Sequence, residues 1–200
     1  MSDANTELVR SIKEHWNAEI STVCQASSVT PAFLAALIAN ESDGKNDAQR
    51  FEPAVFEKLK EVLLGTRPHY APPGIKRPIT KQDLLAYCDP GVGEERGDFA
   101  TSLQCLHNLA TSWGLTQIMG WHLVEFQSGL GTAWLATPGG NLQFATRLLF
   151  WFAEHYGLDI ATGFGDLFTC WNTGEPTGAT YDPQYVPKGI ARMAIWDSLA

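Results

Sequence analysis

Apolar residues recur at helical spacing along most of the chain, and this periodicity constrains the fold more than any other sequence feature. Near the N-terminus, apolar residues at every fourth position predict an amphipathic helix with one buried stripe. They are Leu8, Ile12, Trp16 and Ile20. Thr30 and Pro31 then predict the start of a second helix, because a hydroxyl caps the first turn and proline suits its first position.

Further helical patterns cover residues 53–64, 99–109, 141–156, 166–171 and 185–199. A glycine-flanked stretch from Trp113 to Trp121 predicts a small hairpin, so we expect a mostly α fold of the α+β type. Residues 65–83 contain four prolines and two glycines and predict an irregular loop. We expect this loop to elaborate a single domain spanning residues 1–200, because neither side leaves enough chain for an independent core.

The charge balance excludes some partners. The chain has 14 basic and 22 acidic residues, a net charge of -8, whereas non-specific nucleic-acid binding needs a basic face. Adsorption to an anionic membrane is equally unsupported. The chain is 11% aromatic and contains seven Trp. A polymeric ligand would therefore be held by hydrogen bonds and aromatic stacking, although core packing also accounts for many of these rings.

Metal and cofactor motifs are missing from the sequence. The five histidines form no H-E-x-x-H motif, and the chain has no phosphate-binding loop, dinucleotide fingerprint or G-x-S-x-G elbow. We therefore expect neither a metal site nor a cofactor. The cysteines form no C-x-x-C pair, so we expect mostly buried thiols, and one or two disulfides are the alternative. They are Cys24, Cys88, Cys105 and Cys170.

Glu41 is the acidic residue with the most informative position. It lies at the end of the predicted helix AFLAALIANE, where the negative end of the helix dipole disfavours a second negative charge. The apolar helix before it would also desolvate the carboxyl, and both effects raise its pKa toward the range of a general acid. Most acidic residues at helix ends are simply solvated, so this local argument leaves both roles open.

Three segments taken together resemble the lysozyme-like superfamily of lytic transglycosylases and goose-type lysozymes. They are the helix-end pair Glu41–Ser42, the glycine turn SWGLTQIMGWH at 112–122, and the Asn- and Gly-rich stretch Phe168–Val186. That superfamily has E-S at a helix end, then G-L-x-Q-x-M, then a Y-N-x-G loop with a distal Tyr. The resemblance implies a lysozyme-like fold, with a small hairpin beside an active-site cleft.

The chain is more similar still to the N-acetylmuramidase domain of phage endolysins. RFEPAVF matches an F-E-x-x-x-F stretch after the catalytic Glu, and Ser112–Gly120 matches S-W-G-x-x-Q-I-M-G. Asp166–Gly174 loosely matches a late D-x-x-x-F-x-x-x-Y-N-G stretch, with Trp171 in place of the usual Tyr. The resemblance covers residues 30 to 195.

This resemblance implies a peptidoglycan glycosidase in which Glu41 protonates the β-1,4 bond between N-acetylmuramic acid and N-acetylglucosamine. The residues it implies at the substrate are Ser42, Trp113, Gln117, Asn172 and Tyr185, with Trp121 and Trp171 as further stacking surfaces. Structural roles stay open for several of them. Gln117 can stabilise the hairpin, Ser42 can be a plain helix-end hydroxyl, and at least one Trp belongs to the core.

Hydrolysis needs a second group that activates water, whereas a transglycosylase needs only Glu41. The candidate carboxylates are Asp43, Asp47, Glu52 and Glu57. Glu52 is our choice because it belongs to the F-E stretch, although an ion pair with Arg50 is an equally good explanation of it. We expect a muramidase, because the closer resemblance is to that group. A lytic transglycosylase, and a non-catalytic peptidoglycan-binding module, remain alternatives, while missing metal ligands disfavour an amidase.

The N-terminal sequence is charged and has no signal-type apolar segment, so we expect synthesis in the cytoplasm. Action in the periplasm or cell wall would then follow release by a phage holin or delivery by a secretion machine. The expected partner is the peptidoglycan glycan strand, and a delivered effector would also have an immunity or inhibitor protein. We expect a monomer.

Overall fold

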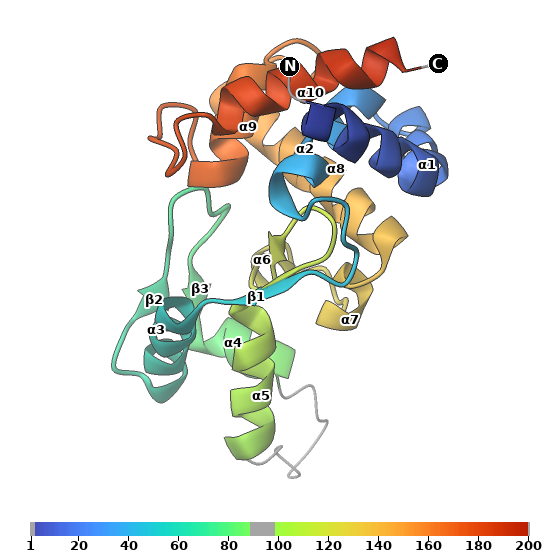
Figure 1. The fold of residues 1–200 in the computed structure, drawn as a ribbon. Coiled ribbons are helices and arrows are strands. Elements are labelled where there is room, and N and C mark those ends of the chain that lie inside the picture. The colour runs from blue at the N-terminus through green and yellow to red at the C-terminus, as the bar shows by residue number, and fades with distance from the viewer. Residues whose placement is uncertain (1–2, 89–98, 200) are drawn as a thin grey trace.

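Helices make up most of the structure and form two groups, which we call the upper and lower lobes after their positions in Figure 1. The computed structural model describes residues 3–88 and 99–199. The upper lobe comprises α1 (Asp3–Gln25), α2 (Pro31–Glu41), α8 (Pro138–Tyr156), α9 (Phe164–Thr173) and α10 (Tyr185–Ser198). The lower lobe comprises α3 (Pro53–Leu64), α4 (Lys81–Cys88), α5 (Phe99–Leu109), β2 (His69–Tyr70) and β3 (Ile79–Thr80). These elements confirm the expected mostly α fold.

The remaining elements lie where the lobes meet. They are β1 (Gln49–Phe51), β4 (Thr111–Trp113), β5 (Ile118–Met119) and the short helices α6 (His122–Glu125) and α7 (Thr132–Leu135). Each lobe has its own cluster of buried apolar side chains. No helix within residues 3–88 and 99–199 combines the length and apolarity needed to cross a membrane.

The α2 helix forms the centre of the upper lobe. It begins as expected, with the Thr30 hydroxyl accepting the Phe33 N–H at 3.3 Å and Pro31 in the first turn. All eight residues from Ala32 to Ala39 are buried, so the helix is apolar around its whole circumference. The buried surface of α2 extends beyond a single apolar face, because α1 and α10 both pack against this helix. A helix buried on all sides leaves only its ends to reach solvent.

The predicted hairpin is present as β4 and β5, paired antiparallel with Trp113 opposite Ile118. A third strand, β1, pairs with β4 and places Phe51 opposite Thr111. This strand is missing from the sequence-based expectation because its three residues are all exposed and show no alternation.

Residues 65–83 are more regular than expected. Within them β2 pairs with β3, with Tyr70 opposite Ile79, and α4 begins at Lys81. Tyr70 and Ile79 are buried in the lower core, and this burial selects the pairing in a stretch that has no apolar period. The expectation of an irregular loop is therefore wrong for residues 69–70 and 79–83 and holds for residues 65–68 and 71–78.

The cysteines also differ from the expectation. Cys88, the last residue of α4, forms a disulfide with Cys105 in α5, while Cys24 and Cys170 are free thiols. The prediction of mostly buried thiols is thus wrong for two of the four. The spacing along the chain gave no sign of this pairing, because it depends on the packing of α4 beside α5.

The disulfide provides the first testable prediction. A crosslink over a sequence separation of 17 should stabilise the fold by about 3 kcal/mol, by restricting the unfolded chain. The double variant Cys88→Ala/Cys105→Ala should therefore unfold at lower urea concentration than the parent. Dithiothreitol should destabilise the parent by a similar amount and leave this variant unchanged. Cys24→Ser is the control, and a parent insensitive to reduction would contradict the prediction.

Candidate active site

Glu41 and Tyr185 meet where two upper-lobe helices end and begin. Glu41 is the last residue of α2, and Tyr185 is the first residue of α10. The Tyr185 hydroxyl donates a hydrogen bond to Glu41 Oε1. The side-chain amide of Asn40 donates to the Tyr185 carbonyl at 3.1 Å, which holds the two helix ends together a second time. The tyrosine ring is buried edge-on against Phe168, so the hydroxyl has a fixed direction.

The protein environment makes Glu41 a weak acid. Burial of the carboxyl raises its pKa from 4.5 to about 7, although the hydrogen bond from Tyr185 and the positive charge of Arg50 both act to lower it. Removal from water is therefore the dominant effect. A carboxyl with this pKa is protonated for much of the time near neutral pH and can donate a proton to a bound substrate.

Ser42 anchors the end of α2 to the β4–β5 turn. Its hydroxyl is buried, 2.7 Å from the Leu115 carbonyl and 3.3 Å from the Ile38 carbonyl. Both hydrogen-bond acceptors of the Ser42 hydroxyl are backbone carbonyl oxygens. The geometry therefore gives Ser42 a positioning role and not direct contact with a ligand. It fixes Glu41 relative to the turn formed by residues 114–117.

Asn141 holds the same turn from the opposite side, and the sequence analysis did not single it out. The residue is fully buried in α8. Its Oδ1 accepts the Thr116 N–H at 2.9 Å and the Thr116 hydroxyl at 2.7 Å, while its Nδ2 donates to the Trp113 and Leu135 carbonyls. A buried amide that makes four hydrogen bonds fixes the local backbone. Its position at the start of a helix carried no sequence signal for this role.

Gln117 is held mainly by the hairpin itself. Its Nε2 donates to the carbonyls of Ala48 at 3.0 Å and Gly114 at 2.9 Å, and its Oε1 accepts the Ser112 hydroxyl at 2.8 Å. The backbone is left-handed, with φ of 52°. These contacts match the alternative structural role, a side-chain amide that stabilises the turn. Gln117 nevertheless also lines a cavity.

This cavity, of about 240 Å³, lies between the β4–β5 turn, α9 and residues 72–74. Gln117, Trp171 and Asn172, three of the residues expected at a substrate, line it together. The Trp171 indole N–H donates to the Thr116 carbonyl at 3.2 Å, which fixes α9 over the turn. Asn172 is exposed at the cavity. Aromatic rings beside amide groups are a surface that suits a sugar, which has apolar faces and hydroxyl edges.

Glu41 does not line the cavity but is connected to it through the β4–β5 turn. The hydroxyl of its neighbour Ser42 bonds to the Leu115 carbonyl, and the cavity residue Gln117 follows Leu115 by two residues, so the Cα atoms of Leu115 and Gln117 are at most about 7.6 Å apart. Tyr185 lines a different cavity, of about 220 Å³, together with Asn40 and Asp43. The structure therefore gathers Gln117, Trp171 and Asn172 around one cavity and pairs Glu41 with Tyr185 at the junction of α2 and α10.

Two of the tryptophans expected to stack on a substrate, Trp113 and Trp121, pack within the protein instead. The Trp113 indole donates to the Asn108 carbonyl at 2.9 Å, and the ring packs against the upper core. Trp121 is buried in the lower core, edge-on to Tyr70. Trp121 still contributes to the cavity wall, whereas Trp113 does not.

Arg50 connects the two acidic residues that the sequence analysis considered catalytic. Its Nε lies 2.6 Å from Glu52 Oε1 in a partly exposed ion pair, and its positive charge also acts on Glu41. Glu52 thus forms the ion pair with Arg50 that the sequence analysis gave as the alternative to a catalytic role. Of the other candidates, Glu57 is exposed and pairs with Lys60, and Asp47 is exposed. Asp43 is exposed and lines a cavity together with Tyr185. Within the described residues, no group of three His, Cys, Asp or Glu side chains is gathered to hold a metal ion.

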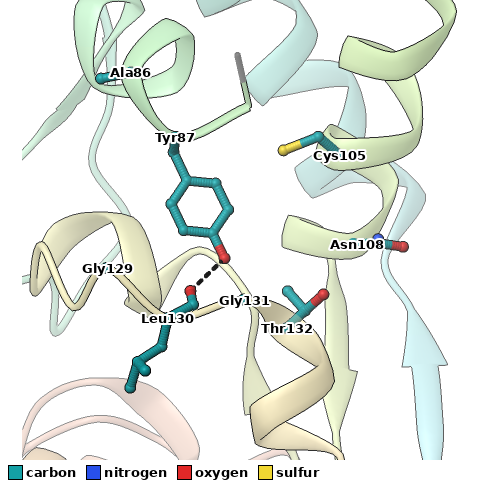
Figure 2. A pocket seen from close by; sticks show the side chains of 8 residues that line it. All are labelled: Ala86, Tyr87, Cys105, Asn108, Gly129, Leu130, Gly131 and Thr132. Atoms are coloured by element: carbon teal, nitrogen blue, oxygen red, sulfur yellow. Dashed lines mark hydrogen bonds between the residues drawn. The ribbon is translucent and has the colours of Figure 1, made fainter. Parts of the chain in front are cut away.

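A second cavity, of about 340 Å³, lies in the region of α4, α5 and the segment 129–132 (Figure 2). Tyr87 points into it and donates its hydroxyl to the Leu130 carbonyl at 2.9 Å. Cys105 and Asn108 form the opposite side. Among the residues that the structure describes, the cavity lining contains no acidic or histidine side chain.

Comparisons with protein-family models, curated proteins and solved structures found no match to this chain. The site therefore stands on its own geometry: a weak acid at a buried helix end, a tyrosine that orients it, and an aromatic and amide-lined cavity beside it.

The burial of Glu41 predicts a measurable stability cost. Between pH 4.5 and about 7 the folded protein retains a proton that the unfolded chain releases, so stability falls as pH rises through this window. Glu41→Gln avoids this loss. It should be more stable than the parent by about 3 kcal/mol above the folded pKa, and the difference should vanish below the unfolded pKa.

Urea unfolding as a function of pH measures this difference. Glu57→Gln is the matched control, because Glu57 is exposed and its replacement should change stability by less than about 0.5 kcal/mol at any pH. Equal pH dependence of the parent and Glu41→Gln would show that Glu41 has an ordinary pKa.

Proposed function

We propose that this chain is a peptidoglycan glycosidase of lysozyme-like fold, with Glu41 as the general acid that cleaves the β-1,4 bond between N-acetylmuramic acid and N-acetylglucosamine. The observation that carries the proposal is the raised pKa of Glu41, about 7, at a buried helix end where Tyr185 fixes one carboxyl oxygen. A protonated carboxyl near neutral pH is the group that protonates a glycosidic oxygen as the sugar bond breaks.

Two features of the surroundings support a glycan as the substrate. The neighbouring cavity offers the rings of Trp121 and Trp171 together with the amides of Gln117 and Asn172. The net charge of -8 argues against capture of a polyanion through charge, so recognition by stacking and hydrogen bonds fits better. Both features agree with the motif resemblance of the sequence.

The mechanism begins with proton transfer from Glu41 to the leaving oxygen, which leaves positive charge on the sugar. In the muramidase reaction, water attacks this sugar and yields a reducing end. A transglycosylase instead uses the resulting Glu41 carboxylate as a base, and the muramic 6-hydroxyl closes a 1,6-anhydro ring. Glu52 is the carboxylate proposed to activate water in the first reaction, and the second reaction does not need it.

The proposed place of action is the periplasm or cell wall, reached by holin release or by a secretion machine. The Cys88–Cys105 disulfide supports action outside a reducing cytoplasm, because such bonds persist in oxidising compartments. The proposed partner there is the peptidoglycan strand.

Mass spectrometry of digested peptidoglycan tests the proposal. The parent should release muropeptides, and Glu41→Gln should lower the rate by about 10²–10⁴-fold, because it removes general acid catalysis. Reducing muramic ends identify a muramidase, and Glu52→Gln should then also lose activity. Products lighter by one water identify a transglycosylase, for which Glu52→Gln should stay active. Full activity of Glu41→Gln would refute the assignment, and binding without turnover in the parent would favour a non-catalytic module.

Tyr185 predicts a shift of the pH profile. Its hydrogen bond stabilises the ionised form of Glu41 and lowers the pKa of that residue, so Tyr185→Phe should raise this pKa further. The alkaline limb of kcat/KM should then move to higher pH by about one unit, the effect of a charge-assisted hydrogen bond. Tyr181→Phe is the control, because Tyr181 is fully exposed. An unchanged alkaline limb with a lower rate would mean that Tyr185 only packs.

A further inference from the structure

A segment of the lower lobe reaches across to the upper lobe. Residues 71–78, which we call the strap, connect β2 to β3 and rise toward the end of α9 (Figure 1). There Gly74 lies against Gly174. A Cβ built on Gly74 would lie 2.5 Å from the Gly174 Cα, closer than real Cβ atoms approach backbone. The two backbones are therefore in direct contact, with no space for a side chain between them.

The contact is anchored on both sides. The Lys76 N–H donates to Oε2 of the buried Glu125 at 2.8 Å. The Arg77 guanidinium forms two 3.0 Å bonds to Asp83 and also donates to the Glu125 carbonyl. On the upper side, the Tyr156 hydroxyl donates to the Gly174 carbonyl at 2.8 Å. Hydrogen bonds to α6 and α4 thus hold the strap in place, and a hydrogen bond within the upper lobe holds Gly174.

The strap forms one wall of the 240 Å³ cavity. Pro72, Pro73 and Gly74 line it from one side, and Trp171 to Gly174 line it from the other. The lobes are also joined through the β1–β4–β5 sheet. The strap, its contact with Gly174 and the sheet thus close a ring of protein, and the cavity lies at this ring between the strap, the β4–β5 turn and α9.

We propose that the Gly74–Gly174 contact makes this an end-acting enzyme, in which a glycan strand reaches Glu41 only by inserting a free end. The inference rests on the proposed function and narrows its substrate to strand ends. The reason is topological, because the middle of a strand cannot pass sideways between two backbones in contact. A strand can pass through the ring that the strap closes only if one of its ends is threaded first.

The parent enzyme provides the first test. Glycan strands freed of their peptides are digested, and the lengths of products and remaining strands are followed chromatographically from the earliest turnover. End action should release disaccharides or other short products at once, while the mean length of the remaining strands stays almost unchanged. Early appearance of strands of intermediate length would show cleavage in the interior and overturn the inference, although glycosidase activity itself would stand. No product at all would overturn both proposals.

Gly74→Asn tests the contact directly. Asn tolerates the left-handed backbone of Gly74, with φ of 70°, but its side chain must push the strap away from α9. The variant should lose the early excess of short products and yield intermediate lengths. Gly174→Asn, which enlarges the other side of the contact, should do the same. Gly157→Asn is the matched control, because its φ is 67° and nothing lies within 4 Å of a Cβ there.

The control variant should retain the product pattern of the parent. If Gly74→Asn and Gly174→Asn both fold, as circular dichroism can establish, and still release only short products, the contact does not determine the mode of action and the inference is wrong.

Discussion

The burial of α2 on all sides is the constraint on which the candidate site depends. Eight consecutive residues, Ala32–Ala39, contribute to the upper core, and α1 and α10 both pack against this apolar helix. The end of this helix is thereby held among other protein atoms instead of projecting into water. Glu41 stands at that end, and its raised pKa is a direct result of the packing that precedes it.

The turn at residues 114–117 is the point where the other parts of the site meet. Ser42 joins it to α2, Asn141 joins it to α8, and Trp171 joins it to α9, each through a hydrogen bond to its backbone. A rigid turn with three such connections positions an acid and a cavity without relying on a flexible loop. The same polar groups are then unavailable to a ligand, which explains why several residues expected at the substrate have structural duties.

The site also shows a conflict between stability and chemistry. A carboxyl with a pKa of about 7 lowers the stability of the folded protein at neutral and higher pH, and a neutral amide at the same position would avoid this cost. Retention of an acid that destabilises the fold because its carboxyl is removed from water is typical of functional sites. Elsewhere the protein contains compensating features, such as the disulfide between α4 and α5.

The sequence by itself determined the local elements. Apolar spacing and capping residues predict the helices, as at the start of α2 with Thr30 and Pro31, and the glycine-flanked stretch that begins at Trp113 predicts the hairpin. It also indicated Glu41, because a helix end is a local feature. Only the tertiary structure decided the Cys88–Cys105 bond, the buried role of Asn141 and the contact of Gly74 with Gly174. Helix periods and caps depend on neighbours a few residues away. These contacts instead join different elements of the chain, and only tertiary packing brings those elements together.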